Sequence, residues 1–411
     1  MNHFFKVKSL DEVLKLTCEF SPIASETIEV ANAFSRILAQ DIRSSSDMPG
    51  FRRSTMDGYA VAASSTFGAS ESNPAWLEIA GTILMGDVPD FKIGPGQAVR
   101  ISTGGMLPEG ANAVVMVEHT EAIDDQSVEI YKSVAPLQNV IDASEDFAKK
   151  EQVLARGTFI RPQEQGLIAG LGIEHIEVYQ RPKVGIISTG DEIIPIDQTP
   201  VPGKIRDINS YALSGFICEA HADPVCYGIV KDDPKALKAS VERAVKETDM
   251  VLISGGSSVG TKDYTIDVLS SLPDTKIRVH GISVSPGKPT ILAKSKNIPI
   301  WGIPGQVTSA MVVVKIAVIP FLDRLKGLIN LDRLDRLTIV PARLSRNVSS
   351  TQGRRDFVRV KLTKEDGRLI ATPILGKSGL IRTMIHANGL LEISDDLEGL
   401  EKDTQVDIIL L

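Results

Sequence analysis

The sequence predicts an α/β multidomain protein built around a mainly parallel α/β sandwich domain. Between residues 183 and 325, short apolar runs alternate with helical stretches, which is typical of a parallel sheet covered by helices on both faces. On either side of this segment, the chain instead carries short β-type runs between Gly and Pro residues. A chain of 411 residues is also too long for one ordinary core. We therefore expect several domains, one of which carries the parallel sheet.

The central segment has clear strand and helix candidates. Met250 to Ile253 is a short apolar run, which is the pattern of a strand buried on both faces. Asp233 precedes Pro234, and Asp is a good cap for a helix that begins at a proline. In chain order, strands are expected at 184–188, 225–229, 250–253, 277–283 and 300–303, and helices at 211–222, 234–247 and 309–325.

The flanking segments predict smaller units. Ser9 and Glu12 have the spacing of a capping box at the start of a first helix, and residues 28–38 carry apolar side chains at helical spacing. The β-rich segment that follows predicts strands at 76–80, 98–101, 113–117 and 128–131. The last part of the chain predicts a small β-domain with strands at 337–342, 356–362, 369–373 and 406–411.

Together these patterns predict four domains. A helical and mixed N-terminal domain is expected to combine residues 1–44 with 141–180, and a β-rich domain is inserted into it at 45–140. The α/β domain is expected at 181–327, and the C-terminal β-domain at 328–411.

Composition and charge argue against several classes of function. The net charge is −7 and no basic run occurs, so we expect no nucleic-acid partner. The cysteines show no Cys-x-x-Cys spacing and the histidines are scattered, which argues against a transition-metal site. Lys315 and Pro320 interrupt the strongest apolar stretch, and the N-terminus lacks the apolar core of a signal peptide. We therefore expect no membrane partner and a cytoplasmic location.

A glycine-rich turn directly follows the strand at 250–253. Its residues are Ser254, Gly255, Gly256, Ser257, Ser258, Val259 and Gly260. Glycines let backbone N–H groups approach an anion closely, and open α/β sheets build phosphate sites at this edge. The turn matches neither the Walker loop nor G-x-G-x-x-G, so the common nucleotide fingerprints do not explain it. It predicts an anion site of another kind.

Four loops follow predicted strands and are expected to converge, because strand carboxyl ends share one edge of a parallel sheet. The loops are 188–192, 231–234, 254–260 and 304–306. Within or just after them lie the carboxylates Glu192, Asp232, Asp233 and Asp263. Carboxylates beside an anion would repel it unless Mg²⁺ bridges them to phosphate oxygens. The plainer alternative, in which each Asp caps a helix and each Gly forms a turn, must hold in all four loops at once.

Three further candidates lie outside these loops. Lys288 stands between Gly and Pro in a stiff turn, where a cation is suited to neutralising an oxyanion, although a solvated turn lysine explains it equally well. Asp57 precedes a Gly in a turn-like segment, and Thr103 follows a short strand. Taken alone, these two segments read as a hairpin turn and a loop with a Ser/Thr turn.

Motifs from all parts of the chain occur in a distinctive order. They are Ser54-x-x-Asp57-Gly-Tyr-Ala, Arg100-Ile-x-Thr103-Gly, Ser188-Thr-Gly-Asp-Glu192, Asp232-Asp233, the glycine-rich turn through Asp263-Tyr264, Pro286-Gly-Lys288-Pro, Pro304-Gly305, Ser378-Gly-Leu and Ala387-Asn-Gly-Leu390. In this order they resemble the molybdopterin molybdotransferase family, which includes the gephyrin E domain. The resemblance covers nearly the whole chain, and so many ordered motifs are highly specific.

The resemblance implies an enzyme of molybdenum cofactor biosynthesis. Such proteins use adenylylated molybdopterin and molybdate as substrates. In a Mg²⁺-dependent step, AMP is released and molybdenum is inserted into the pterin. The resemblance also implies an elongated homodimer in which the α/β domain of one subunit faces the β-rich domain of its partner. Molybdopterin adenylyltransferase and the apo-enzymes that receive the cofactor are further expected partners.

The resemblance also assigns roles to the candidate residues. The residues expected to be catalytic are Asp57, Thr103, Glu192, Asp232 and Asp263, and of these Glu192, Asp232 and Asp263 are expected to bind Mg²⁺. The residues expected to bind substrate are Ser254, Gly255, Gly256, Ser257, Ser258, Gly260, Lys288, Pro304, Gly305 and Ser378. In this assignment the glycine-rich turn holds the phosphates, while Lys288, Thr103 and Ser378 contact the pterin phosphate or molybdate.

Several positions depart from the usual family pattern. Ile141 replaces an Arg, Ser285 a basic residue, Gln306 an Asn and Val307 a Pro. Losing two cationic contacts is expected to weaken binding of a polyanion by about 1.5–3 kcal/mol per charged hydrogen bond. The candidates to replace these cations are Arg100, Lys204 and Arg206.

Three alternatives stay open in the sequence. The oxyanion is molybdate or the nearly isosteric tungstate. The α/β domain also resembles molybdopterin adenylyltransferase, which uses MgATP in the preceding step, although the additional domains favour the insertion enzyme. The departures favour a catalytically weakened paralogue that acts as a pterin carrier or scaffold, but the intact carboxylates oppose it. We favour the insertion enzyme.

Overall fold

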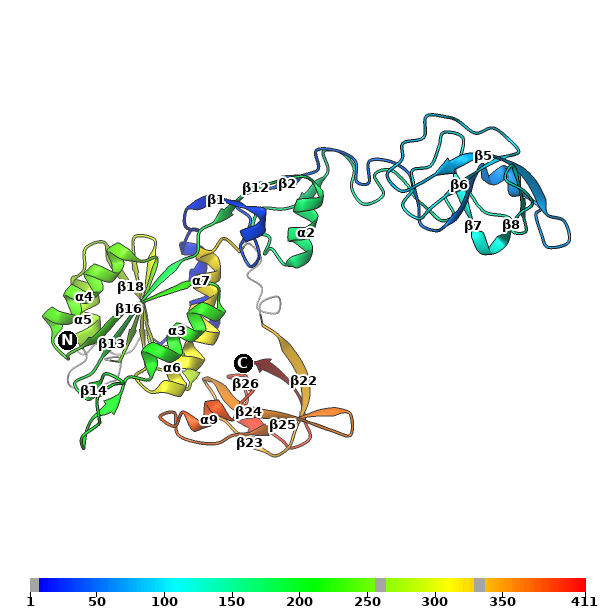
Figure 1. Ribbon diagram of the computed structural model, residues 1–411. Coiled ribbons are helices and arrows are strands. Elements are labelled where there is room, and N and C mark those ends of the chain that lie inside the picture. Colours follow the sequence, from blue (N-terminus) through cyan, green and yellow to red (C-terminus); the bar gives the residue numbers. More distant parts are fainter. Residues whose placement is uncertain (1–6, 256–263, 329–336) are drawn as a thin grey trace. The chain divides into compact units, whose positions relative to one another are not determined.

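The computed structural model describes residues 7–255, 264–328 and 337–411, and Figure 1 shows its ribbon. The chain forms two compact units. The first unit is Met1–Gln40, Arg156–Gln165 and His175–Leu411, and the second is Asp41–Ala155 and Gly166–Glu174. The chain passes from one unit to the other within α2 (Pro162–Gly170). The boundaries of the four expected domains stay a prediction.

A six-stranded sheet in the first unit has the strand order β16-β13-β17-β21-β20-β18. Its bounds are β13 Lys183–Thr189, β16 Asp223–Val230, β17 Met250–Ser254, β18 Thr275–His280, β20 Ile291–Ser295 and β21 Ile298–Ile303. The first four strands of the order pair in parallel, whereas β20 pairs antiparallel with both β21 and β18. The predicted mainly parallel sandwich is confirmed. The sequence missed β20, because a tight hairpin joins it to β21 without a helix between them.

Helices cover both faces of this sheet (Figure 1). One face packs against α3 (Asn209–Glu219), α6 (Val307–Val313) and α7 (Ile319–Leu325). The other face packs against α4 (Pro234–Glu247) and α5 (Tyr264–Ser271). Alternate residues of β17 belong to opposite clusters, as expected for a strand buried on both faces.

The predicted helix at 309–325 contains a wide turn in its middle. A π-helical stretch, Val314–Val318, joins α6 to α7. Pro320 lies in the first turn of α7 and has no N–H to donate to the preceding turn. A π turn widens the helix locally, and such a turn accommodates the break in the hydrogen-bond ladder.

The C-terminal part of the first unit is a closed β-barrel. The strand order is β19-β24-β25-β22-β28-β26, and β26 also pairs with β24, which closes the ring. The bounds are β22 Ile339–Leu344, β23 Val348–Ser349, β24 Arg355–Glu365, β25 Arg368–Pro373, α9 Arg382–Ile385, β26 Gly389–Ile393, β27 Gly399–Leu400 and β28 Gln405–Leu410. β19 (Val284–Ser285) comes from the α/β segment and pairs with the start of β24. This pairing joins the Lys288 turn to the barrel.

The N-terminal elements of the first unit correct one prediction. α1 (Leu10–Lys15) begins at the predicted capping box, in which both side-chain-to-backbone hydrogen bonds form. The helix predicted at 28–38 is wrong, because β1 (Ser25–Glu29) and a 3-10 turn (Val30–Asn32) lie there. β1 pairs antiparallel with β12 (His175–Tyr179), so pairing with a distant segment overrides the local helical spacing.

The second unit contains another six-stranded sheet, of order β7-β4-β6-β5-β9-β8. Its strands are β4 Gly58–Val61, β5 Ala75–Ile83, β6 Gln97–Ile101, β7 Ala113–Met116, β8 Thr120–Ala122 and β9 Ser127–Ile130. The unit also contains two separate two-stranded pairs. They are β2 (Ile42–Arg43) with β11 (Gln152–Leu154) and β3 (Arg53–Ser54) with β10 (Val140–Ile141). The β-rich character predicted for this part of the chain is confirmed.

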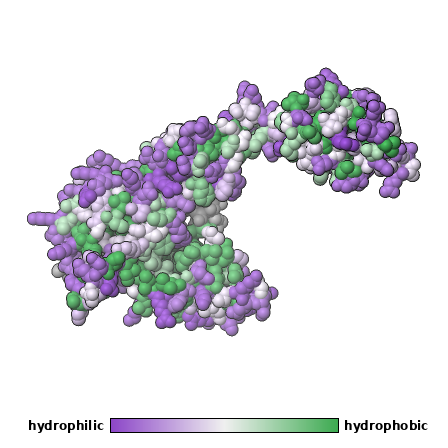
Figure 2. Space-filling model, viewed as in Figure 1, coloured by the Kyte–Doolittle hydropathy of each residue, from purple (hydrophilic) through white to green (hydrophobic). Residues whose placement is uncertain are grey.

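Large apolar side chains fill the core of the first unit. Trp301 and Phe321, for example, pack edge to face with their ring centroids 5.0 Å apart. Figure 2 shows hydrophilic side chains over much of the visible surface. Within the described ranges, no helix is both long enough and apolar enough to span a membrane.

Candidate functional site

The described parts of the four loops expected to converge meet at one edge of the α/β sheet. The N–H of Gly190, which follows β13, donates to the carbonyl of Val230 at the end of β16 (3.3 Å). The N–H of Gly255, which follows β17, donates to the carbonyl of Ile303 at the end of β21 (3.2 Å). Backbone hydrogen bonds thus join the loops in neighbouring pairs.

Gly255 occupies a position that only glycine fits. Its φ is +106°, and a Cβ atom there would lie 2.2 Å from the carbonyl oxygen of Thr189. A Cβ on Gly305 would lie 3.5 Å from the Cα of Gly255, so the backbones of these two loops touch. The other members of the predicted phosphate turn and its carboxylate lie outside the described residues, namely Gly256, Ser257, Ser258, Gly260 and Asp263.

Asn209 at the start of α3 ties two of these loops together. Its Nδ2 donates to Ser254 Oγ (2.6 Å) and to the carbonyl of Gly305 (2.9 Å). Asn209 and Ser254 are both buried. The sequence offered the segment before Asn209 only as a source of cations, because a single amide gives no pattern of its own. Ser254 is thus held inside the edge of the sheet by a residue that sequence reasoning missed.

Two of the three expected metal-binding carboxylates, Glu192 and Asp232, lie around the end of β13. Asp232 Oδ1 accepts from Thr189 Oγ1 (3.0 Å), and its Oδ2 accepts from the N–H of Asp191 (3.4 Å). In return, Asp191 Oδ1 accepts from the N–H of Asp232 (3.2 Å). The Glu192 carboxylate lies over Gly190, since a Cβ on this glycine would be 2.7 Å from Glu192 Oε2. All three carboxylates are exposed, and Asp191 is an addition to the predicted set.

These carboxylates are hard oxygen ligands of the kind that Mg²⁺ takes. In the part of the chain that the structure describes, no three His, Cys, Asp or Glu residues form a group that could hold a metal ion. Mg²⁺ does not need such a cage, because it usually takes one or two carboxylates and completes its octahedral shell with water and phosphate oxygens. Glu192 and Asp232 are the predicted ligands that the structure describes at this edge.

Asp233 has the plainer of the two predicted roles. Its Oδ2 accepts from the N–H of Ala236 (2.8 Å), so it caps the N-terminus of α4. At this position the capping interpretation is confirmed. The two adjacent aspartates therefore have different roles. Asp232 belongs to the loop cluster, and Asp233 caps the helix.

Replacing Asp233 with alanine is expected to lower the free energy of unfolding by about 1 kcal/mol, because the first turn of α4 loses its cap. Urea denaturation of the full chain measures this change. Asp233→Asn is the matched control, since an asparagine caps as well as an aspartate. Equal losses in both variants would show that the charge, rather than the cap, stabilises the helix.

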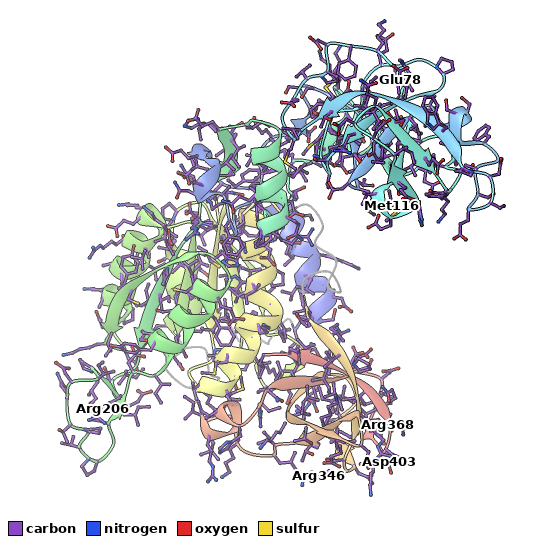
Figure 3. The ribbon with its side chains drawn as sticks, turned by 45° about the vertical axis from the view of Figure 1, so that its right-hand side comes forward. Glu78, Met116, Arg206, Arg346, Arg368 and Asp403 are labelled. Atoms are coloured by element: carbon purple, nitrogen blue, oxygen red, sulfur yellow. The ribbon has the colours of Figure 1, made fainter. Side chains whose placement is uncertain are left out.

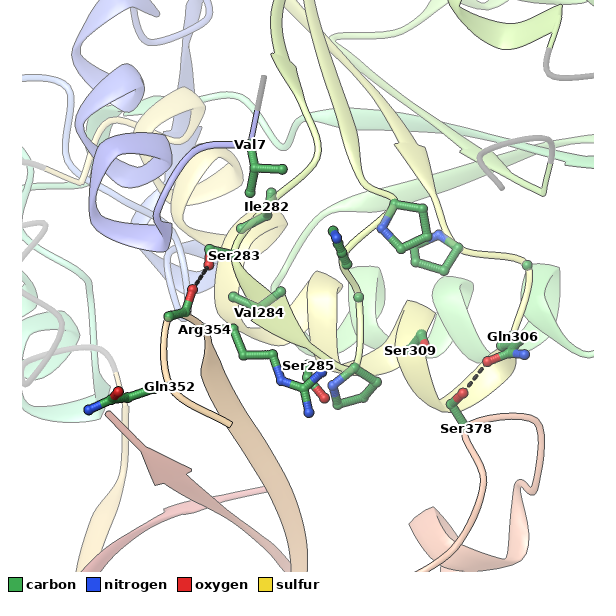
Figure 4. A pocket seen from close by; sticks show the side chains of 17 residues that line it. Val7, Ile282, Ser283, Val284, Ser285, Gln306, Ser309, Gln352, Arg354 and Ser378 are labelled. Carbon is green, nitrogen blue, oxygen red and sulfur yellow. Dashed lines mark hydrogen bonds between the residues drawn. The ribbon is translucent and has the colours of Figure 1, made fainter. Parts of the chain in front are cut away.

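A pocket of about 700 Å³ lies within the first unit and shares Pro304 and Gly305 with the sheet edge (Figure 4). Its walls come from the turn at 282–289, the loop at 304–306, and barrel residues 352–354. Of the described residues that line it, Lys288 and Arg354 are cationic and none is acidic. The pocket therefore suits an anion with several oxygen acceptors.

Arg354 is a candidate that sequence reasoning missed. It is exposed, and its Nε lies 3.1 Å from Asp356 Oδ1. The pairing of β19 with β24, and a hydrogen bond from Ser283 Oγ to the carbonyl of Gly353 (2.5 Å), hold it beside the Lys288 turn. Its neighbour Arg355 is paired with Asp11 and Glu392 and does not line the pocket. Two adjacent arginines give no sign in the sequence of which one faces a pocket.

Ser378 lies on the pocket wall, in the loop between β25 and α9. Its Oγ donates to Gln306 Oε1, and its carbonyl accepts from the N–H of Thr308 (3.1 Å). Nη2 of the buried Arg359 holds the same loop through the carbonyl of Gly376 (2.8 Å), and burial lowers the pKa of this arginine. The predicted substrate residues that share this pocket are Lys288, Pro304, Gly305 and Ser378.

The cations suggested as replacements are engaged elsewhere. Arg206 lies on the ribbon of β14 (Ile193–Ile194) and β15 (Ile205–Arg206), and its Nε donates to two carbonyls at 3.0 and 3.1 Å (Figure 3). Lys204 Nζ donates to the carbonyl of Asp191 (2.6 Å). In the second unit, Arg100 Nη2 donates to the hydroxyl of Tyr59 (3.1 Å). Arg354 is paired with Asp356 but lines the pocket, which none of these three residues does, so it is the better candidate for the second cation.

Asp57 and Thr103 lie together in the second unit. Asp57 Oδ1 accepts from the N–H (2.7 Å) and from Oγ1 (3.2 Å) of Thr103. Both residues are exposed. Segments that, taken alone, read as unrelated turns therefore form one cluster. In the same unit, Ile141 is part of β10 and pairs with Arg53 of β3.

Comparisons with known families agree with these features. Residues 8–172 match the MoeA N-terminal region (domain I and II), and residues 341–411 match the MoeA C-terminal region (domain IV). Between them, residues 185–324 match the family described as "Probable molybdopterin binding domain". This chain belongs to the MoeA family. The resemblance identified in the sequence, and with it the α/β multidomain fold class, are confirmed.

Known MoeA-type proteins are similar to the chain over almost its whole length. A Methanocaldococcus jannaschii protein named for molybdopterin biosynthesis is 38% identical over 393 residues, which cover 93% of this chain and 92% of that protein. The molybdopterin molybdenumtransferase of Bacillus subtilis is 30% identical over 407 residues, covering 98% and 94%. The crystal structure of MoeA from Pyrococcus horikoshii OT3 aligns with a TM-score of 0.83 at 32% identity, covering 99% and 100%.

Proposed function

We propose that this MoeA chain is a molybdopterin molybdenumtransferase that inserts molybdate, or tungstate, into adenylylated molybdopterin with release of AMP in a Mg²⁺-dependent step. The observation that carries the proposal is the pocket, in which Lys288, Arg354 and Ser378 line one volume. Relatives named molybdopterin molybdenumtransferase support it. Matches to the N- and C-terminal MoeA regions favour this activity over adenylyl transfer.

The pocket supplies what an oxyanion needs. A tetrahedral oxyanion has only acceptor oxygens and a negative charge, so it is recognised by hydrogen-bond donors and cations. Lys288 and Arg354 contribute both, and the Ser378 hydroxyl lies on the same pocket wall. With no acidic group among the described lining residues, the pocket imposes no repulsion of its own on such a ligand.

The neighbouring sheet edge is suited to the phosphates of the pterin substrate. Gly255 and Gly305 bring backbone without side chains to this edge, which leaves room for an anion to approach the main chain. Glu192 and Asp232 would hold Mg²⁺, which would polarise phosphate oxygens and offset their repulsion from the carboxylates. Pro304 and Gly305 also line the oxyanion pocket, so the two sites lie next to each other.

We also infer that the protein acts as a homodimer, in which Asp57 and Thr103 of the partner copy complete the site. Their mutual hydrogen bonds make one exposed cluster, and this supports a shared role. The adenylyltransferase partner, the recipient apo-enzymes and the cytoplasmic location stay predictions.

The test is AMP release from adenylylated molybdopterin by the purified chain, with molybdate, with tungstate and without oxyanion. We expect release that is stimulated by one oxyanion, is stopped by a chelator and is restored by excess Mg²⁺. Lys288→Met should reduce the stimulated rate by about tenfold or more, because a charged hydrogen bond is lost. Lys276→Met, at an exposed lysine of β18 away from the pocket, is the matched control.

Tight pterin binding without AMP release would refute the enzymatic proposal. The carrier alternative would then take precedence, and the departures at Ile141, Ser285 and Val307 would be its physical basis.

A further inference from the structure

Gln306 and Ser378 face each other on the pocket wall (Figure 4). The Ser378 hydroxyl donates its hydrogen to Gln306 Oε1. Gln306 occupies the N-cap position of α6, yet its side chain makes no capping hydrogen bond there. The amide of Gln306 is therefore used on Ser378 rather than on its own helix.

This hydrogen bond withholds the only proton of the Ser378 hydroxyl. A serine hydroxyl has one donor and two acceptor lone pairs. While it donates to Gln306, it offers an incoming ligand only lone pairs, and these repel the oxygens of an oxyanion. The arrangement seen in the structure is thus unfavourable for oxyanion binding at this one residue, although Lys288 and Arg354 favour it.

Rotation of the Gln306 amide would reverse this situation. The terminal torsion of a glutamine is broad and roughly two-fold, so its carbonyl and amino groups exchange places at low cost. With Nε2 turned toward Ser378, the amide donates and the hydroxyl oxygen accepts. The serine proton is then free to point at a bound oxyanion. A carboxylate cannot make this exchange, because it only accepts.

We propose that Gln306 is a positioning residue that sets whether the Ser378 hydroxyl can donate to a tetrahedral oxyanion such as molybdate or tungstate. The inference rests on the proposed function, since it takes the pocket as the oxyanion site. It adds a residue that acts on the ligand through Ser378.

A double-mutant cycle tests the coupling, with molybdate binding to the full chain measured by calorimetry without pterin. In the wild-type background, Ser378→Ala should weaken molybdate binding by about tenfold, because one donor to a charged ligand is lost. Gln306→Glu should weaken it at least as much, since the carboxylate fixes the serine proton and adds a negative charge. In the Gln306→Glu background, Ser378→Ala should then cost nothing further.

Gln352→Glu separates the effect of charge from the effect of hydrogen bonding. Gln352 also lines the pocket but donates to the carbonyl of Asp396 (3.2 Å) rather than contacting Ser378. Its variant adds the same charge, so binding should weaken, but Ser378→Ala should still cost about tenfold in that background. Thermal unfolding of every variant shows that each is folded before binding is compared.

The outcomes distinguish this inference from the function on which it rests. Independent, multiplicative losses from Gln306→Glu and Ser378→Ala would overturn the coupling, while Lys288-dependent binding would leave the pocket proposal intact. Absence of molybdate binding to the wild-type chain would overturn both the inference and the pocket assignment. AMP release would then report separately on whether the enzyme acts at all.

Discussion

Replacing Gly255 with alanine is expected to abolish AMP release and to lower the free energy of unfolding by about 2–4 kcal/mol. Two effects act together. The backbone has φ +106°, which strains any residue with a Cβ, and the new methyl group would lie 2.2 Å from the carbonyl oxygen of Thr189. That oxygen belongs to β13, which pairs with strands on both sides and cannot move cheaply. Urea denaturation and AMP release measure the two consequences.

Gly305→Ala is the matched control for stability at the same edge. A Cβ there would meet the Cα of Gly255 at 3.5 Å, which is an ordinary contact. Its effect on the free energy of unfolding should stay within about 0.5 kcal/mol. If Gly255→Ala were as stable as the wild type, Gly255 would not lie as close to the carbonyl of Thr189 as described. The predicted anion site at this edge would then lose its main support.

Patterns that repeat along the chain were the best guide to the fold. The alternation of apolar runs and helices predicted the sandwich, and the Asp-Pro pair predicted the start of α4, because both signals are local. The hairpin strand β20 was missed, and one element that depends on a distant partner was misassigned. Residues 28–38 have apolar side chains at helical spacing, but the strand at Ser25–Glu29 pairs with β12. No pattern within residues 28–38 predicts a partner so far away in the sequence.

The same distinction holds at the candidate site. Parallel strand ends predicted that the loops around Asp232 and Gly255 would meet, since sheet topology alone requires it. Arg354 could not be predicted in this way, because the short pairing of β19 with β24 brings it beside Lys288. Gln306 stood out only as a departure from the family pattern. Its contact with Ser378 depends on how a barrel loop meets the start of α6.

The adjacent residues Asp232 and Asp233 provide the sharpest test of the proposed metal site. If Asp232 binds Mg²⁺ as proposed, Asp232→Asn is expected to reduce Mg²⁺-dependent AMP release by at least about 100-fold, because the ion would lose one of its few protein ligands. The carbonyl of an asparagine can still accept from the N–H of Asp191 while its amino group donates to the Thr189 hydroxyl, so the loop should keep its shape. Raising the Mg²⁺ concentration should recover part of the activity, since weaker metal binding can be offset by mass action.

Asp233→Asn changes the same charge one residue further along and should leave AMP release unchanged, because its side chain caps α4 and an asparagine can replace it there. If both variants lost activity equally, the overall negative charge of the loop would matter rather than a specific ligand. If Asp232→Asn lost activity but Mg²⁺ did not restore any of it, Asp232 would act through its hydrogen bonds to Thr189 and Asp191 instead. The metal would then have to be held by Glu192 and by groups outside the described residues.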